Sequence, residues 1–131
     1  MNDRDCAIGI AIVEDEREIV NIYQIAFARR KLPVCFVAYD GREAVKMFRS
    51  ASPRPGIILM DHRLPGMTGV EAAKKILDLA PDTKIIFLSA DANVKQEALK
   101  AGALTFLKKP ATLKEVNSAI DNAMKGEPIV A

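Results

Sequence analysis

The sequence IILMDHRLPGMTG, residues 57–69, joins four apolar residues to an aspartate and a loop with a Pro-Gly turn. A short apolar run bounded by turn residues is typical of a strand that is buried on both faces, as in a parallel sheet. The run ends at Asp61, and open α/β sheets bind ligands at the carboxyl ends of their strands. Aspartate is also common in loops, where its side chain hydrogen-bonds to nearby backbone. This stretch alone therefore supports a ligand site and a simple loop cap equally well.

Apolar runs of the same kind alternate with segments of helical periodicity along the whole chain. Expected strands cover residues 7–13, 34–38, 57–60, 84–88 and 105–108, and expected helices cover 16–30, 40–50, 68–79, 93–101 and 112–125. Strict alternation predicts a parallel sheet with helices on both faces. Right-handed crossovers leave few topologies for it. The prediction is an α/β fold with a doubly wound five-stranded parallel sheet, strand order 2-1-3-4-5, flavodoxin-like (βα)5.

The expected helix starts share a capping pattern, in which Ser, Thr, Asp or Asn is followed three residues later by Glu or Gln. The pairs are Asp15/Glu18, Asp40/Glu43, Thr68/Glu71, Asn93/Gln96 and Thr112/Glu115. The first pair is ambiguous, because Asp15 has a second use discussed below.

Composition narrows the class of protein. The chain has 131 residues, is 50% hydrophobic and 27% charged, and carries a net charge of +2. These values predict a single domain over residues 1–131, with a core at about 7–125, short polar tails and no direct nucleic-acid binding. The absence of a long apolar run or a signal peptide predicts a cytoplasmic protein without membrane contact. Cys6 and Cys35 fit no metal spacing and are expected to be small buried hydrophobic residues.

Polar residues follow four of the five expected strands. Glu14-Asp15, Asp61, Ser89 and Lys109 come after the first, third, fourth and fifth strand. In the order 2-1-3-4-5 these strands are contiguous, and the carboxyl ends of parallel strands lie at one edge. The side chains should therefore gather in one crevice, which favours a site over a loop cap for Asp61.

The chemistry of this group predicts a metal and a phosphoryl ligand. Three crowded carboxylates repel one another, and a hard cation removes the conflict. Oxygen ligands with water in the remaining positions suit Mg²⁺, with Mn²⁺ as a substitute. Lys109 offers a compact positive charge to a phosphoryl oxygen, and Ser89 offers a hydroxyl group. The sequence has no His/Cys cluster or glycine-rich phosphate loop, and an aspartate can act as nucleophile to form an aspartyl-phosphate.

Taken together, these motifs resemble the receiver domains of the two-component response-regulator family, over about residues 8–125. The motifs are the acidic pair at 14–15, Asp61 within MDHRLPGMTG, Ser89-Ala90 after an apolar strand, Phe106 three residues before Lys109, and Lys109-Pro110. The nearest type is a single-domain, chemotaxis-regulator-like receiver. In such proteins the central aspartate accepts phosphate from a histidine-kinase phosphohistidine.

The resemblance implies a role for each site residue. Asp61 is the phosphoacceptor. The implied metal ligands are Asp15 directly, Glu14 through water, Asp61, and the backbone carbonyl of Arg63. The implied phosphoryl-binding groups are Ser89, Lys109 and the backbone N–H groups of His62 and Ala90. Glu14, Ser89 and Ala111 depart from the commoner family residues without removing a required group, and the family usually has a cis bond at the position of Pro110.

The implied switch connects the site to a distant surface. Phosphorylation would draw Ser89 toward the new group, and the Phe106 ring would turn inward into the space left behind. The surface formed by the fourth helix, fifth strand and fifth helix (residues 93–125) would then change shape. Phe106 can equally be ordinary core, and the His62 ring is expected to be a solvated loop side chain. Arg63 and Asp91 are expected either to pair across the site and slow hydrolysis, or to be simple exposed charges.

Three function classes fit a chain of this kind. The first, which the site residues favour, is a phosphorylation-switched signalling module of a two-component phosphorelay. Such a module is not expected to be an enzyme, apart from self-catalysed phosphoryl acceptance and slow autodephosphorylation. The second is a receiver-like interaction scaffold that is never phosphorylated. The third is an Mg²⁺-dependent phosphatase with an Asp nucleophile, which commonly carries a second Asp where this chain has Arg63.

The expected partners are a sensor histidine kinase or phosphotransfer protein and a downstream protein. Only about six residues follow the last helix, so output by protein contact is expected. The expected state is a monomer or a phosphorylation-dependent dimer.

Overall fold

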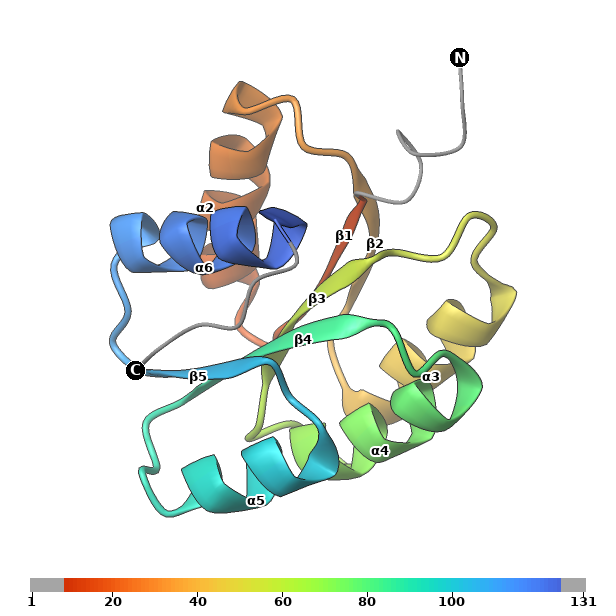
Figure 1. The fold of residues 1–131 in the computed structure, drawn as a ribbon. Helices are drawn as coiled ribbons and strands as arrows, with labels where there is room; N and C mark the ends of the chain where they lie inside the picture. The colour runs from red at the N-terminus through yellow and green to blue at the C-terminus, as the bar shows by residue number, and fades with distance from the viewer. Residues whose placement is uncertain (1–8, 126–131) are drawn as a thin grey trace.

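The computed structural model describes residues 9–125, and its centre is a sheet of five parallel strands (Figure 1). The strands are β1 (Ile10–Val13), β2 (Val34–Ala38), β3 (Ile57–Asp61), β4 (Lys84–Ser89) and β5 (Thr105–Lys108). They lie in the order β2-β1-β3-β4-β5, and every neighbouring pair is parallel. The predicted fold class and strand order are confirmed.

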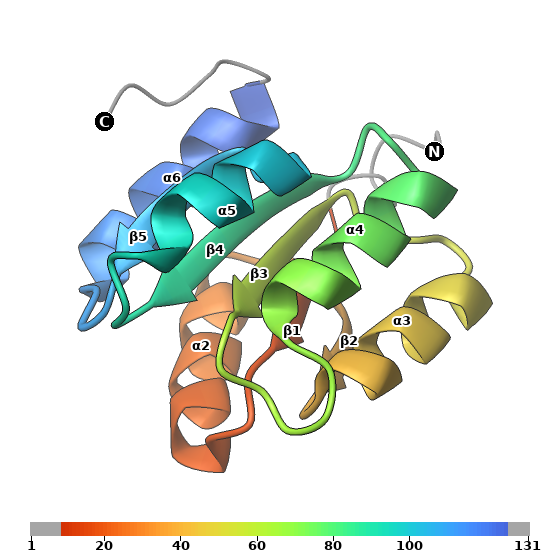
Figure 2. The same cartoon turned by 90° about the horizontal axis from the view of Figure 1, so that it is seen from below.

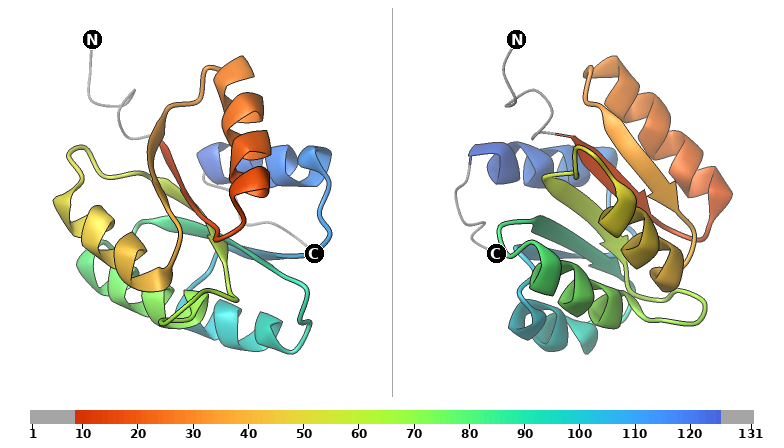
Figure 3. Two further views of the ribbon diagram at one scale, coloured as in Figure 1. Left: turned by 180° about the vertical axis from the view of Figure 1, so that it is seen from behind. Right: turned by 90° about the vertical axis from the view of Figure 1, so that its right-hand side faces the viewer.

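Helices cover both faces of this sheet. They are α2 (Arg17–Arg29), α3 (Gly41–Ser50), α4 (Gly69–Leu79), α5 (Val94–Ala101) and α6 (Leu113–Lys125). Helices α2 and α6 lie on one face, and α3, α4 and α5 lie side by side on the other (Figures 1, 2 and 3). Each face has its own apolar cluster, so the sheet is the middle of three layers.

Strand β3 shows why its sequence is continuously apolar. All five of its residues are buried. Ile58 and Met60 pack into the cluster beneath α3, α4 and α5, whereas Ile57 and Leu59 pack into the cluster beneath α2 and α6. Each such side chain contributes about 1.5–3 kcal/mol by leaving water. A polar residue at the end of this strand is therefore held by a rigid, fully packed support.

Three helix starts form the predicted side-chain caps. At α4, Thr68 and Glu71 form a complete capping box. At α6, the Thr112 hydroxyl oxygen accepts the Glu115 N–H at 3.1 Å, and the Glu115 carboxylate accepts the Thr112 N–H at 2.9 Å. At α3, the Asp40 carboxylate accepts the Glu43 N–H at 2.7 Å.

The predicted caps at the other two helices are wrong. Helix α2 follows Glu16 and has no side-chain cap, because Asp15 belongs to the carboxylate group described below. Asn93 already has helical backbone angles (φ −68°, ψ −18°), from which its side chain does not cap. Instead, the Asp91 carboxylate accepts the Asn93 N–H at 2.9 Å.

The prediction for Cys35 is also wrong. This residue is exposed, because it lies on β2, the strand at one edge of the sheet. Cys6 lies outside the described residues. Within residues 9–125, no helix has the length and apolar character needed to cross a membrane.

The caps give a direct test of these assignments. Replacing Thr112 by Ala removes a cap hydrogen bond and should lower the free energy of unfolding by about 1 kcal/mol, measured by urea denaturation. The matched change Asn93→Ala should alter it by less than about 0.5 kcal/mol, because the Asn93 side chain makes no cap bond. An equal loss in both variants would contradict the assignment.

Candidate functional site

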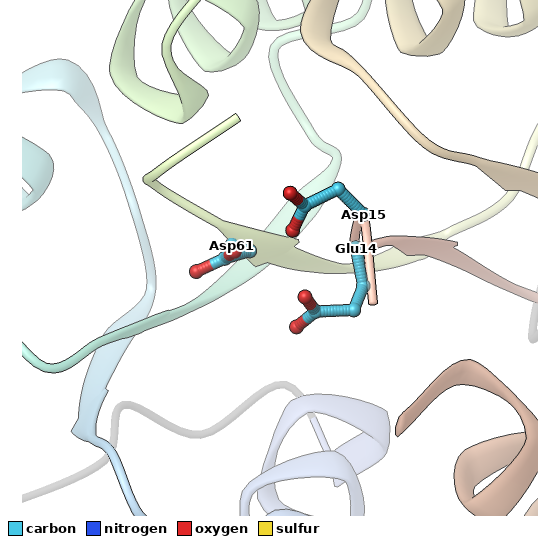
Figure 4. A group of neighbouring side chains, drawn as sticks. All are labelled: Glu14, Asp15 and Asp61. Atoms are coloured by element: carbon cyan, nitrogen blue, oxygen red, sulfur yellow. The ribbon is translucent and has the colours of Figure 1, made fainter. Parts of the chain in front are cut away.

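Three carboxylates meet where β1 and β3 end. Parallel pairing places Val13 beside Met60, so the residues that follow, Glu14 and Asp61, come together at the sheet edge. Oxygen atoms of Glu14, Asp15 and Asp61 all lie within 4.8 Å of one another (Figure 4). Glu14 and Asp61 are buried, and Asp15 is exposed.

Lys109 supplies the opposite charge from the β5–α6 loop. Its Nζ atom lies 2.9 Å from Glu14 Oε1 and 3.3 Å from Asp61 Oδ1. Its backbone N–H donates to the Ser89 carbonyl at 2.9 Å, which ties the ends of β4 and β5 together. The Lys109–Pro110 peptide bond is cis, as the resemblance implies, and Ser52–Pro53 is a second cis bond that was not foreseen.

Burial governs the proton affinities of this group. Burial raises the pKa of Asp61, and the charge of Lys109 offsets only part of this effect. The pKa of Glu14 is raised for the same reason, against the hydrogen bond from Lys109. Burial pulls the pKa of Lys109 down, but its hydrogen bond to Glu14 and the charge of Asp61 outweigh burial, and this pKa is raised. One ammonium group therefore does not fully compensate the buried negative charge.

Ser89, at the end of β4, is the remaining predicted side chain at this edge of the sheet. It is buried, and its hydroxyl oxygen accepts the Asp91 N–H at 3.1 Å. A cavity of about 260 Å³ opens here, lined by Asp15, Glu16, Asp61, Arg63, Ser89, Ala90, Asp91 and Lys109. The predicted convergence of residues from the ends of four strands is confirmed, and the role of each residue stays a prediction.

The donor set fits a hard divalent cation. It offers only oxygen ligands, two of them on buried carboxylates whose pKa values are raised by burial. A cation beside them would lower the cost of keeping them ionised, and the open cavity leaves room for water ligands. Glu14, Asp15 and Asp61 are the residues that would hold Mg²⁺.

Comparison with known proteins identifies the family. The family model described as "Response regulator receiver domain" matches residues 10–121. The chain belongs to the response regulator receiver domain family. The chemotaxis protein CheY of Thermotoga maritima is 32% identical over 118 residues, covering 88% of this chain and 97% of that protein. This family is a signalling module and not a classical enzyme.

Longer relatives share the receiver domain. The transcriptional regulatory protein LiaR of Bacillus subtilis is 38% identical over 118 residues, covering 87% of this chain. The chain spans 55% of LiaR and 25% of the regulatory protein AtoC of Escherichia coli. A solved LuxR-family response regulator from Aurantimonas sp. SI85-9A1 superposes with a TM-score of 0.85 at 26% identity, covering 95% of this chain and 89% of that one.

Gly69 holds the loop that follows the central aspartate of this receiver domain. Its N–H donates to the His62 carbonyl at 2.9 Å. A Cβ at this position would lie 2.3 Å from the Asp61 carbonyl oxygen, so only glycine fits. The loop that contains Arg63 is therefore fixed by backbone packing, although the metal contact of the Arg63 carbonyl stays a prediction.

The His62 ring differs from expectation. It is not a solvated loop side chain: it is half-buried against the Phe87 ring (centroids 6.3 Å apart), and among residues 9–125 its buried Nδ1 has no hydrogen-bond partner. The backbone N–H of His62 donates to the Leu88 carbonyl at 3.2 Å, which continues the β3–β4 pairing. A hydrogen bond from the His62 backbone is also among the effects that oppose the rise in the pKa of Asp61 caused by burial. The contact of this N–H with a phosphoryl group stays a prediction.

Arg63 and Asp91 do not form the ion pair that was one of the two expectations. Both border the cavity, but the ion pairs within residues 9–125 do not include them. The Asp91 carboxylate is used at the start of α5, where it accepts the Asn93 N–H. Arg63 is exposed, which agrees with the simpler expectation for it.

One further residue of the site was missed, and a second residue lies beside the site. Glu16 lines the cavity, and its N–H donates to Glu14 Oε2 at 3.2 Å. Tyr23 is buried one to two turns into α2, where burial raises its pKa and the charges of Lys109, Glu14 and Asp61 act on it. Glu16 directly follows the acidic pair, and that adjacency was the available signal. Phe106 is half-buried at the edge of the α3–α5 cluster, and its role as a switch stays a prediction.

The buried charge gives a stability prediction. Folding raises the pKa of Asp61, so the folded state binds the Asp61 proton more tightly than the unfolded state does. In the absence of divalent metal, the free energy of unfolding therefore falls as the pH rises from the unfolded-state pKa of Asp61 through its folded-state pKa. Asp61→Asn removes this loss, while Lys109 keeps Glu14 as partner. The variant should melt a few degrees higher than the parent protein in EDTA at neutral pH, and the gain should shrink in acid.

The control is Asp78→Asn, which removes an exposed carboxylate on α4. Its melting temperature in EDTA should match that of the parent protein at every pH. An Asp61→Asn protein that melts lower at neutral pH would show that the buried carboxylate stabilises the fold.

Proposed function

We propose that Asp61 accepts a phosphoryl group from the phosphohistidine of a sensor histidine kinase or phosphotransfer protein. The observation that carries this proposal is the position of the Asp61 carboxylate. It lies at the mouth of a cavity, 3.3 Å from the Lys109 ammonium and beside two further carboxylates. Family membership supports the same assignment.

The transfer requires little from the protein beyond position and charge. An Asp61 carboxylate oxygen attacks phosphorus, an O–P bond forms, the N–P bond breaks, and its electron pair leaves with the histidine nitrogen. Lys109 already contacts Asp61 and can follow the charge onto a phosphoryl oxygen. When bound, Mg²⁺ would neutralise negative charge on the phosphoryl oxygens and the carboxylates. The same arrangement accounts for self-catalysed acceptance from a small phosphodonor.

Ser89 connects this event to the rest of the domain. Its oxygen is the acceptor in the bond from the Asp91 N–H, so its O–H hydrogen remains available to a phosphoryl oxygen. Rotation toward that group would release Asp91 and the start of α5. Phe106 pairs with Phe87 across β4 and β5, next to this region. The surface formed by α5, β5 and α6 is therefore the proposed output surface.

An apolar groove beside the site offers a docking place for the phosphodonor. It has a volume of about 370 Å³ and is lined by Glu16, Ile19, Ile22, Tyr23, Ala90, Lys109, Pro110, Ala111 and Leu113. Ile22 and Leu113 are 51% and 40% exposed. Glu16, Ala90 and Lys109 also line the phosphoryl cavity, so a helix seated in the groove would bring its histidine to Asp61.

Phosphoryl acceptance can be measured by intact mass after incubation with Mg²⁺ and acetyl phosphate. The parent protein should gain one phosphoryl group, and Asp61→Asn should gain none, because it lacks the nucleophile. Asp82→Asn, an exposed site before β4 at the opposite edge of the sheet, should behave as the parent. No adduct on the parent protein would favour an interaction scaffold, and turnover of added phosphomonoesters would favour a phosphatase.

Docking can be separated from chemistry with Ile22→Asp, which places a charge in the apolar groove. Transfer from the histidine kinase that reacts fastest in a panel should slow by about tenfold or more, since losing an interface anchor costs more than about 1 kcal/mol. Acceptance from acetyl phosphate should be unchanged. The control Leu79→Asp alters an exposed apolar residue on α4 and should leave both rates intact. Equal slowing in both variants would refute docking at this groove.

A further inference from the structure

A second groove, between α3 and α4, has only cations among its charged lining residues. These are Arg42, Lys46 and Arg49 on α3 and Lys75 on α4, and the groove has a volume of about 460 Å³. These four side chains carry four positive charges, whereas the net charge of the whole chain is only +2. It lies on the face of the sheet opposite α2 and α6 (Figure 2).

Glu43 and Glu71 are used at the starts of α3 and α4, and the third acidic residue of these helices, Asp78, is exposed near the end of α4, three residues after Lys75. The Glu43 carboxylate accepts the Tyr39 N–H at 2.7 Å. Glu71 belongs to the α4 capping box, and its pKa is lowered first by hydrogen bonds from Thr68 and then by the charges of Lys74 and Lys75. Glu71 therefore partly balances Lys75, one turn away.

On α3, Glu43 lies three residues before Lys46 and partly balances it. Arg42 and Arg49, in contrast, have no acidic residue three or four positions away. The ion pairs within residues 9–125 are Arg30–Asp121, Lys109–Glu14 and Lys109–Asp61, none of which lies in the groove. Arg42, Lys46 and Arg49 are spaced four and three residues apart, so they form one stripe. Like charges at this spacing weaken a helix. An anionic ligand bound along the stripe would reduce the repulsion between these cations, so the stripe is well suited to such a ligand.

The floor of the groove is apolar and firmly held. Val45 is buried, and Met67 is half-buried. The Met67 backbone packs closely against Gly41, since a Cβ on Gly41 would lie 2.3 Å from the Met67 carbonyl oxygen. This packing holds Met67 in place. The groove therefore combines a preformed apolar floor with a cationic rim.

We propose that the groove between α3 and α4 docks an acidic segment of a partner protein, with one apolar side chain seated over Val45 and Met67. Carboxylates on both sides of an apolar anchor complement the rim and the floor together. A nucleic-acid backbone or an anionic lipid surface would use the cations but would leave the floor without a matching group. This interface is separate from the phosphodonor groove and from the proposed output surface.

The test uses the full chain and a fluorescein-labelled, Glu-rich peptide with one central Leu, with binding followed by fluorescence anisotropy at low ionic strength. The double variant Lys46→Glu/Arg49→Glu should weaken binding by about tenfold or more, because it reverses the charge of the rim. The new acid at position 46 attracts Arg42, but it also faces Glu43 and the new acid at position 49 at three-residue spacing, so far-UV circular dichroism is used to show that the variant keeps the helix content of the parent. The matched control Lys100→Glu/Lys114→Glu makes the same charge change at exposed lysines of α5 and α6 and should bind as the parent does.

A peptide with Ser in place of the central Leu tests the floor and should bind several-fold more weakly. Equal peptide binding by the groove variant and the control variant would overturn the proposal. So would tighter, Lys46/Arg49-dependent binding of a single-stranded RNA oligonucleotide or of phosphatidylserine vesicles. None of these outcomes depends on phosphorylation of Asp61, so this proposal and the proposed function can fail independently.

Discussion

The ammonium group of Lys109 against the carboxylates of Glu14 and Asp61 is the interaction on which the site depends. Two buried carboxylates within 4.8 Å of each other and of Asp15 would be difficult to keep ionised without a nearby cation. One lysine reduces the cost, yet burial still raises the pKa of both acids. The site is thus left with an excess of negative charge, which a bound divalent cation would compensate. A phosphoryl group on Asp61, as proposed, would add more negative charge and increase the need for the same cation.

This arrangement is available only because of the strand order. Glu14 and Lys109 are separated by 95 residues in the chain, and they meet because β1, β3, β4 and β5 are contiguous and parallel. The same geometry gives two further results. The Lys109 N–H joins the Ser89 carbonyl, so the lysine and the serine cannot move apart at the backbone. The absence of a side chain at Gly69 lets α4 begin against the Asp61 carbonyl, which keeps the loop after Asp61 short and close.

The sequence was sufficient to predict the sheet, its strand order and the convergence of the polar side chains. Buried parallel strands are recognisable as continuous apolar runs, and the topology then determines where the ends of the strands lie. Features that depend on a single backbone angle or one hydrogen bond were not predictable. Asn93 fits the capping pattern but has helical angles. The Asp91 carboxylate, not the Asn93 side chain, accepts a backbone N–H at the start of α5. Cys35 was assigned to the core because the sequence does not reveal which face of an edge strand is covered.

The surface chemistry divides along the same layers as the core. On the α2 and α6 side, the exposed Ile22 and the half-buried Ile19 line a groove beside the cavity at Asp61 and favour contact with an apolar helix. On the other side, α3 and α4 present cations over a small apolar floor. The two surfaces differ in chemistry, so the two proposed partners would differ as well. They also lie on opposite faces of the sheet, so the two proposed partners could be bound at the same time. Met67 of the second surface lies on the loop that follows Asp61. A ligand there would press on the backbone that directly follows Asp61.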